Sequence, residues 1–286
     1  MKIRFESQGR WWEADLDGRQ ELAISQTFTT DQPNHFGVPL ATRQPVQMGG
    51  FVGAVARGGG CNVDSIHLIP HCNGTHTESL SHILAAATNV PPLVIPPLFL
   101  SVLVSVAPVP AQECAESYRP RLEPTDRVVT RQHLCESYER ARTAVAPPRP
   151  DNSPSLVPGL IVRTLPNSPS KRQARYGAEQ QPCFFTSEAM EWIAASFEHL
   201  LVDVPSIDRI FDEGLLSNHH LFWRVPTGTH AATASSARHK TITELIYVPE
   251  TIADGVYLLN LQTPAWATDA APSRPLLFPV QTVTAP

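Results

Sequence analysis

Residues 90–109 form an uncharged, largely apolar segment long enough to cross a membrane, but its prolines exclude a membrane-spanning helix. Proline occupies positions 91, 92, 96, 97 and 108, and it breaks a helix because it lacks the backbone N–H and clashes with the preceding turn. Between these prolines, Leu98–Val106 is an almost continuous apolar run. We therefore predict a buried β-strand there, in a protein that does not insert into a membrane.

Proline is frequent throughout the chain, with 28 prolines among 286 residues, about twice the average usage. This frequency predicts long ordered loops and little continuous helix. The length suits one large domain or two small ones. Because the proline-rich stretch 144–158 leads directly into a predicted core strand, Leu160–Thr164, we predict a single domain over residues 1–286, with residues 1–21 as an N-terminal hairpin extension.

Composition excludes several classes of partner and compartment. Charged residues make up 17% of the chain, the net charge is -5 and no basic run occurs, so we expect no nucleic-acid partner. Five cysteines without regular spacing argue against a disulfide framework. The first residues, Met1–Ser7, lack the apolar core of a secretory signal. We therefore expect a cytoplasmic protein.

Two segments predict helices, and several short apolar or alternating runs predict strands. One helix is expected within residues 128–141, with Thr130 as its N-cap, and another begins at Thr186 or Ser187. Gly58–Gly60 is interpreted as a turn, because it lacks the Lys-Ser/Thr step of a phosphate-binding loop. The predicted strands are residues 2–7, 11–16, 22–27, 65–69, 160–164, 200–204, 241–246 and 256–261.

Residues 70–83 concentrate the side chains that bind transition metals. His71, Cys72, His76, Glu78 and His82 offer imidazole nitrogen, thiolate sulfur and carboxylate oxygen, the donors that zinc and its neighbours prefer. A turn in this stretch would bring several of them together at low cost in loop-closure entropy. The alternative is a solvated polar loop with incidental histidines.

The spacing within this stretch allows three side chains to point at one site. His76 and Glu78 share a face if the backbone is extended, and Glu78 and His82 share a face if a helix begins near Thr77. We therefore predict a strand, then a turn, then a short helix over residues 77–87 behind the site.

The run Asn-Gly-Thr-His-Thr-Glu-Ser-Leu-Ser-His that ends at His82 resembles the signature of the cyclase family of metal-dependent hydrolases, which includes bacterial kynurenine formamidase. The family signature reads His-x-Gly-Thr-His-x-Asp-x-Pro-x-His. Its Gly-Thr-His and its last histidine match in register, whereas Glu78 and Leu80 replace Asp and Pro. The first histidine falls on Cys72, with His71 one residue further out, and either residue could supply the ligand.

A second group of candidate residues lies further along the chain. By the resemblance, His219 in the pair His219-His220 would hold a second metal ion, and Glu244 in the predicted strand 241–246 would be a bridging carboxylate. Since only one of two neighbouring histidines faces the metal if this segment is a strand, His220 remains an alternative. The polar residues 227–240 between the two ligands are an insertion relative to the family. Phe36 is the nearest match to a family aromatic residue that contacts the substrate.

The resemblance implies a mixed α/β single domain with the swivelling β/β/α fold. It also implies hydrolysis of an amide, formamide, cyclic amide or lactone bond of a small-molecule substrate by a metal-activated water, with one or two zinc ions or manganese. His76, Glu78 and either Cys72 or His71 would hold the first ion, Glu78 and Glu244 would bridge to the second, and His82 would transfer protons. A homodimer or higher homo-oligomer is expected, with residues 90–110 as a possible interface. Asp203 and Asp208 would orient groups around the metal, and the alternative is a helix cap at Ser206 or Asp208.

Two alternatives to a hydrolase stay open at this level. One is a metal-binding protein without turnover, in which four protein ligands including the cysteine close the first coordination shell. The other is a scaffold of the same fold that has lost its metal. His82 favours the hydrolase, because a closed structural site needs no additional base.

Overall fold

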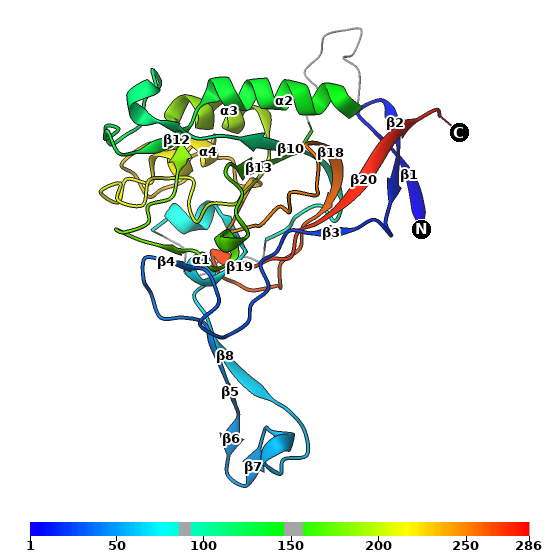
Figure 1. Cartoon of the computed structure of the whole chain (residues 1–286), viewed down its shortest axis with the longest axis vertical. Helices are drawn as coiled ribbons and strands as arrows, with labels where there is room; N and C mark the ends of the chain where they lie inside the picture. The colour runs from blue at the N-terminus through cyan, green and yellow to red at the C-terminus, as the bar shows by residue number, and fades with distance from the viewer. Residues whose placement is uncertain (86–92, 146–156, 286) are drawn as a thin grey trace.

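The computed structural model describes residues 1–85, 93–145 and 157–285. The proline-rich stretch 144–158 and the beginning of segment 90–109 lie mostly outside these ranges. One mixed sheet forms the body of the molecule (Figure 1). Its strands follow the order β1 (Lys2–Ser7), β2 (Arg10–Asp15), β20 (Leu276–Val283), β18 (Gly255–Asn260), β10 (Phe99–Val106), β13 (Gly159–Thr164), β16 (His199–Val202), β17 (Thr241–Glu244), β9 (His76–Ser79) and β19 (Ala270–Pro272), and β3 (Gln20–Glu21) also pairs with β20.

The centre of the sheet is parallel and buried on both faces. β10 pairs with β13, β13 with β16 and β16 with β17, all in parallel. Along β10, Val102 and Val104 join the apolar cluster on one face while Leu103 joins the cluster on the other. Burial on both faces explains why this strand is an apolar run, as predicted for Leu98–Val106. Of the region expected to form an interface, only flanking side chains such as Val94 and Leu98 are exposed.

Helices α2 (Arg131–Val145), α3 (Ser187–Ser196) and α4 (Ser217–Trp223) lie along one side of the sheet (Figure 1). Both predicted N-caps are confirmed. The Thr130 hydroxyl accepts a hydrogen bond from the His133 backbone N–H, and the Thr186 hydroxyl accepts one from the Ala189 N–H. No described helix has the length and apolarity to span a bilayer.

Two sequence-based predictions about secondary structure were wrong, those for residues 77–87 and 22–27, and the strand considered for the segment around His219 does not form. The helix over residues 77–87 is instead strand β9 followed by a 3₁₀ turn, η2 (Leu80–Ile83), because β9 hydrogen-bonds to β17 and β19 on its two sides; residues 86–87 lie outside the described ranges. The segment around His219 is helix α4 rather than a strand. Of residues 22–27, only Ala23 makes a β-bridge, to Ile246.

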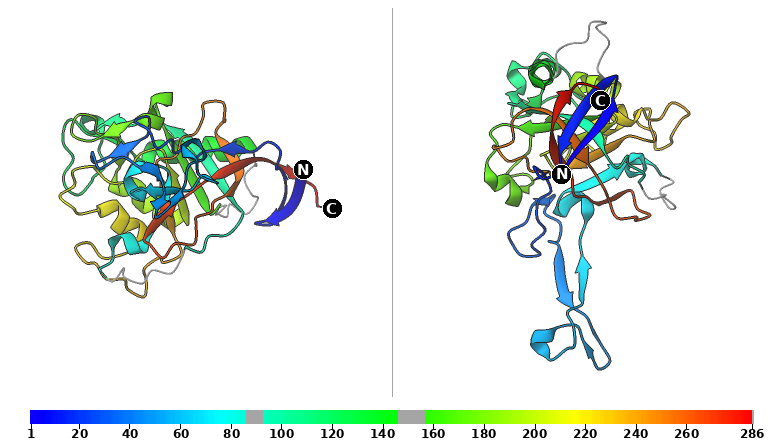
Figure 2. Two further views of the ribbon diagram at one scale, coloured as in Figure 1. Left: turned by 90° about the horizontal axis from the view of Figure 1, so that it is seen from below. Right: turned by 90° about the vertical axis from the view of Figure 1, so that its right-hand side faces the viewer.

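The N-terminal hairpin β1–β2 is confirmed and continues the main sheet through the pairing of β2 with β20. Trp12 lies in the core with 5% of its surface exposed. The two termini lie near one another at this end of the molecule (Figure 2).

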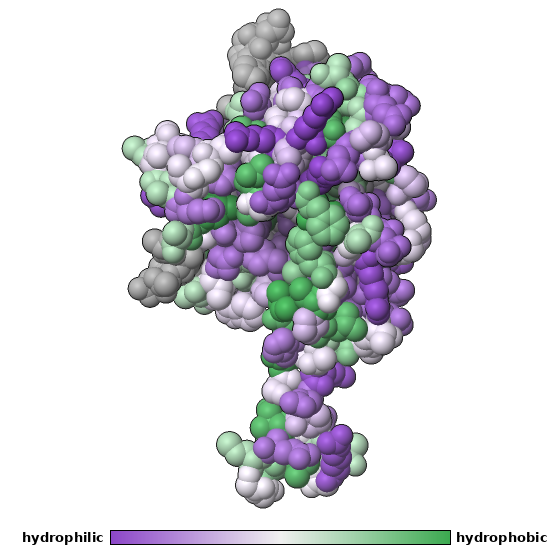
Figure 3. Space-filling model, turned by 90° about the vertical axis from the view of Figure 1, so that its left-hand side faces the viewer, coloured by the Kyte–Doolittle hydropathy of each residue, from purple (hydrophilic) through white to green (hydrophobic). Residues whose placement is uncertain are grey.

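An arm projects from the body between β4 (Asn34–His35) and α1 (Pro70–Asn73) (Figures 1 and 2). It consists of β5 (Thr42–Pro45) paired with β8 (Asp64–His67), and of a distal part with β6 (Gln47–Met48), β7 (Phe51–Val52) and η1 (Val55–Arg57). The predicted glycine turn lies here, and Gly59 is required because a Cβ there would lie 1.9 Å from the Val52 carbonyl oxygen. Figure 3 shows apolar surface where the arm joins the body and again along the arm, where the exposed apolar side chains are Met48, Phe51, Val55, Val63 and Ile66.

Candidate metal centre

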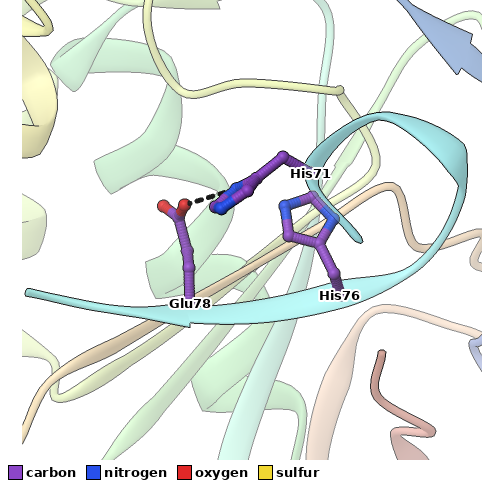
Figure 4. Close-up of side chains that lie close together, drawn as sticks. All are labelled: His71, His76 and Glu78. Carbon is purple, nitrogen blue, oxygen red and sulfur yellow. Dashed lines mark ion pairs between the residues drawn. The ribbon is translucent and has the colours of Figure 1, made fainter. Parts of the chain in front are cut away.

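Strand β9 places the two central residues of the site. His76 and Glu78 are two residues apart, so they lie on the same face of the strand, and both are fully buried (Figure 4). Glu244 of β17 lies opposite His76 in the register of the two strands. The period-two prediction for His76 and Glu78 is therefore confirmed, whereas His82 reaches the site through η2 and not through a helix.

The Gly-Thr step before β9 fixes the strand in position. The Thr75 hydroxyl donates to the Leu245 carbonyl at 2.5 Å and accepts from the Ile24 N–H at 2.9 Å. A Cβ on Gly74 would lie 2.9 Å from the side-chain oxygen of Gln26. These contacts tie β9 to the end of β17, so the two carboxylates that the strands carry keep a fixed separation.

Glu78 is the centre of the cluster. Its Oε1 lies 3.0 Å from Nε2 of His219, and its Oε2 lies 3.2 Å from Nδ1 of His71 and 3.8 Å from Nε2 of His82. His76 completes the group, with its Nε2 3.5 Å from Oε2 of Glu244. The structure therefore brings together all the predicted residues except Cys72 and Phe36.

Asp208 fixes the orientation of the His219 ring. Nδ1 of His219 donates to Asp208 Oδ2 at 2.6 Å, and Tyr118 donates its hydroxyl to Oδ1 at 2.7 Å. The backbone N–H groups of Asn218 and His219 also donate to this carboxylate, at 2.8 and 3.1 Å. Because a carboxylate that accepts N–H groups from the first turn stabilises a helix start, Asp208 explains both why α4 is a helix and why its histidine points at Glu78.

Asp203, the other aspartate considered from the sequence, lies elsewhere. It accepts from the backbone and hydroxyl of Thr164 and pairs with Lys171 at 2.8 Å.

Sequence reasoning missed Asp269, a residue in the loop before β19. Its Oδ2 accepts from Nε2 of His71 at 2.9 Å and from Nδ1 of His82 at 3.2 Å. The aspartate reaches both rings because β19 pairs with the metal-site strand β9. Nothing in its local sequence, Ala-Thr-Asp-Ala, signals this position, which depends on pairing between strands far apart in the chain.

The buried histidines and carboxylates of the cluster shift one another's pKa values. Burial alone would raise the pKa of Glu78, but His82 and His219 hold it well below its usual range. Burial also opposes charge on His71, yet hydrogen bonding to Asp269 and the nearby Glu78 raise the pKa of His71 to about 10. The same carboxylate of Glu78, with Asp208, raises the pKa of His219 above its ordinary value despite burial.

The donors fit a divalent transition-metal ion. His71, His76 and Glu78 each offer one ligand atom within 4.8 Å of the others, and so do Glu78, His82 and His219. Two of these atoms, Nε2 of His76 and Oε2 of Glu78, are buried and make no hydrogen bond with the described residues, although Oε2 forms an ion pair with His71 at 3.2 Å. Nδ1 of His76 donates to the Gly74 carbonyl, so its Nε2 is left to face the cluster as an acceptor. A bound cation would interact favourably with both Nε2 of His76 and Oε2 of Glu78.

Cys72 is buried but lies outside these groups of ligand atoms. Burial, together with the charge of Glu244, raises the pKa of its thiol to about 11, so it stays protonated at neutral pH. Of the two alternatives for the first ligand, the structure brings His71 to Glu78 and leaves Cys72 aside.

The remaining predicted residues lie around the cluster. His220 donates from Nδ1 to the Val225 carbonyl at 3.3 Å, away from Glu78. The insertion 227–240 contacts the site indirectly, because His230 hydrogen-bonds to the Ile83 carbonyl at the end of η2. Phe36 is half-exposed and lines a cleft of about 510 Å³, together with Tyr176 and Phe211.

His35, which the sequence did not single out, lies beneath Phe36 with 3.9 Å between the ring centroids. It is buried, and its Nδ1 has no partner among the described residues. Burial and the neighbouring His76 and His71 lower its pKa to about 4, so it is neutral at physiological pH.

Metal binding is expected to release protons. His71 has a pKa of about 10 in the metal-free protein and is therefore protonated at neutral pH, whereas a ligand nitrogen must be free of its proton. Because its folded pKa is raised, this histidine stabilises the metal-free fold below pH about 6.5, and that contribution is lost as the pH rises through about 10. Calorimetric titration with zinc in buffers of different ionisation enthalpy measures the release. Heats that do not depend on the buffer would contradict it.

Comparisons with known proteins concern the family and the fold. The Cyclase family model ("Putative cyclase") matches residues 22–209. A predicted metal-dependent hydrolase from Bacillus stearothermophilus is 16% identical with a TM-score of 0.54, covering 91% of this chain and 97% of that one. Isatin hydrolase A from Ralstonia solanacearum is 12% identical with a TM-score of 0.57, and the match covers 93% of each chain. Isatin hydrolase A from Labrenzia aggregata is also 12% identical, with a TM-score of 0.56, and the match covers 92% of this chain and 94% of that one. No curated protein matches the sequence.

At these identities the structural likeness establishes the fold. It confirms the predicted mixed α/β fold, in which the sheet described above carries few helices.

Proposed function

The chain belongs to the Cyclase family, whose model matches more than half of its length, and from this membership we propose that it is a metal-dependent hydrolase of amide-type or lactone bonds. The observation that carries the proposal is the environment of Glu78. A fully buried carboxylate faces three histidines from three different segments.

His71, His76 and Glu78 would hold one divalent ion, and His219 and Glu244 stand beside Glu78 to hold a second. Such an ion, when bound, lowers the pKa of water and polarises the substrate carbonyl. Zinc is the metal we propose, with manganese as the alternative, because the donors are imidazole nitrogens and carboxylate oxygens.

His82 is the proposed proton-transfer residue. Its Nδ1 donates to Asp269, which turns Nε2 towards the side of Glu78. A quarter of its side chain remains exposed, unlike that of the buried His76, so it can meet a substrate. In this position Nε2 can accept a proton from the attacking water and return it to the leaving nitrogen or oxygen.

The substrate class we propose is a formamide, a cyclic amide or a lactone. Isatin hydrolases among the structural neighbours support an amide-type substrate. Phe36, Tyr176 and Phe211 give the cleft aromatic walls, which suit an aromatic or other planar substrate. His35 lies between the cleft and the cluster, because its ring packs against that of Phe36 while His76 and His71 are close enough to lower its pKa.

The test is a hydrolysis screen of zinc- and manganese-reconstituted protein with an aryl formamide, a cyclic amide and a lactone. We expect at least one of the three to be hydrolysed, with activity lost after EDTA treatment and restored by metal. Metal-loaded protein that hydrolyses none of these classes would overturn the proposal. It would then favour the metal-binding protein without turnover.

A pair of variants distinguishes the two candidates for the first ligand. We expect His71→Ala to weaken zinc binding by at least about tenfold, because it removes a proposed ligand, and Cys72→Ser to leave the affinity unchanged within about twofold. Zinc affinity is measured by competition with a chromogenic chelator. The opposite ranking would show that the cysteine coordinates the ion.

We also propose that the protein is a cytoplasmic homodimer or higher homo-oligomer. All five cysteines are free, which supports a reducing compartment. The uncovered apolar side chains of the arm support self-association, since such surface is usually covered in an assembly.

A further inference from the structure

A polar cavity of about 310 Å³ lies at the C-terminal ends of α3 and α4, outside the metal centre. Trp223 separates the two: its ring lies 5.6 Å from that of His219, while its indole N–H donates to the Lys240 carbonyl at 3.0 Å. The charged and polar residues that line the cavity are Ser196, Glu198, Arg224, Ser235, Ser236, His239 and Lys240.

Lys240 is a buried cation without a carboxylate partner. It is 5% exposed and makes no ion pair with any described residue, since Glu198, which lines the same cavity, acts on its pKa through charge alone and forms no hydrogen bond with it. The ammonium donates to the Ala194 carbonyl at the end of α3 and lies 5.0 Å from the centre of the Phe222 ring. An ammonium group has three N–H donors, and one of them is used here. Buried lysines are rare unless they are paired, so this one lacks its usual compensation.

Arg224 adds a second positive charge to the same cavity. Its guanidinium makes no hydrogen bond or ion pair with any residue in the described ranges, and its backbone adopts a left-handed conformation, with φ at 55°, at the end of α4. Glycine is the common residue in that conformation at a helix C-terminus. Burial lowers the pKa of Lys240 to about 8, and the nearby positive charge of Arg224 contributes to the lowering.

One carboxylate, Glu198, faces these two cations, so positive charge exceeds negative charge around the cavity. We infer that the cavity binds a small oxyanion, a carboxylate or phosphate group, between the guanidinium of Arg224 and the ammonium of Lys240. An anion there would remove the repulsion between the cations and use their free donors. The planar guanidinium matches both groups, because it can donate two parallel hydrogen bonds to either.

The inference is tested by calorimetric titration of the full-length protein, as purified, with inorganic phosphate and with acetate at constant ionic strength. Phosphate also binds metal ions, so the diagnostic quantity is the difference between variants. Arg224→Gln and Lys240→Met remove the proposed contacts. Arg238→Gln is the matched control, because Arg238 is an exposed neighbour that does not line the cavity.

We expect saturable binding of at least one probe to the parent and to Arg238→Gln, weakened at least about tenfold in Arg224→Gln and in Lys240→Met. Because Arg224 is exposed, its variant keeps the test valid even if Lys240→Met fails to fold. The stronger probe identifies the anion as phosphate-like or carboxylate-like. The inference is overturned if neither probe binds, or if Arg238→Gln loses as much affinity as Arg224→Gln. Neither result depends on hydrolytic activity.

Discussion

Replacing His82 with glutamine is expected to lower kcat/KM by about 10²- to 10⁴-fold while the metal content stays unchanged. Glutamine keeps a polar side chain of similar length but cannot accept and return a proton near neutral pH. His82 contacts Glu78 at 3.8 Å, further than His219 or His71 does, so its removal should leave the ion in place.

Initial rates on the best substrate of the screen, with metal analysis of the same samples, measure this effect. His67→Gln is the matched control, because His67 is an exposed histidine on the arm. A His82→Gln enzyme that retains full activity would assign proton transfer to another group. Loss of metal along with the activity would instead make His82 a ligand.

Asp208→Asn is expected to weaken zinc binding by about 10- to 100-fold. The aspartate accepts the Nδ1 proton of His219, which leaves Nε2 for Glu78 or a metal. If the amide nitrogen of asparagine faces His219, it must donate instead, which favours the other tautomer and places a proton on the nitrogen that should bind the metal.

The comparison variant for Asp208→Asn is Tyr118→Phe. It removes one hydrogen bond to the carboxylate but leaves the charge and the contact with His219, so we expect less than about a fivefold loss in zinc affinity. Competition titration with a chelator ranks the two variants. Equal affinities for Asp208→Asn and the parent would show that the orientation of His219 does not limit metal binding.

The part of the site that the sequence predicted correctly depends on local geometry. His76 and Glu78 share a face because the chain is extended there. Side chains alternate between the two faces of a strand, so this pairing can be predicted even for a strand of four residues. The buried strand β10 and the caps at Thr130 and Thr186 were predicted for the same reason, since each depends on adjacent residues.

The errors arise where distant residues decide local structure. The sequence after Thr77 is rich in Ala and Leu, which have high helix propensity. The backbone of β9 instead forms its hydrogen bonds with β17 and β19. The apolar run after His219 is compatible with a strand, but the segment forms helix α4. Asp208, eleven positions earlier, accepts hydrogen bonds from the first turn of this helix. The role of Asp269 could not be predicted from local sequence, because its hydrogen-bond partner His71 is 198 residues away in the chain.

The choice between the adjacent residues His71 and Cys72 could not be predicted from the sequence either. The family register favoured position 72, and the ligand types alone allowed either residue. A single helical turn, α1, decides between them by directing the imidazole towards Glu78 and burying the thiol apart from the ligand groups.

The measurement that tests the metal centre most directly is elemental analysis by plasma mass spectrometry of the purified parent beside a His76→Ala, Glu78→Ala double variant. Because Glu78 also contacts His71 and His219, circular dichroism is used to check that the double variant is folded. We predict about one or two equivalents of zinc or manganese in the parent and none in the variant. No metal above background in the parent, even after reconstitution, or equal metal in a folded variant, would contradict the assignment of a metal centre around Glu78.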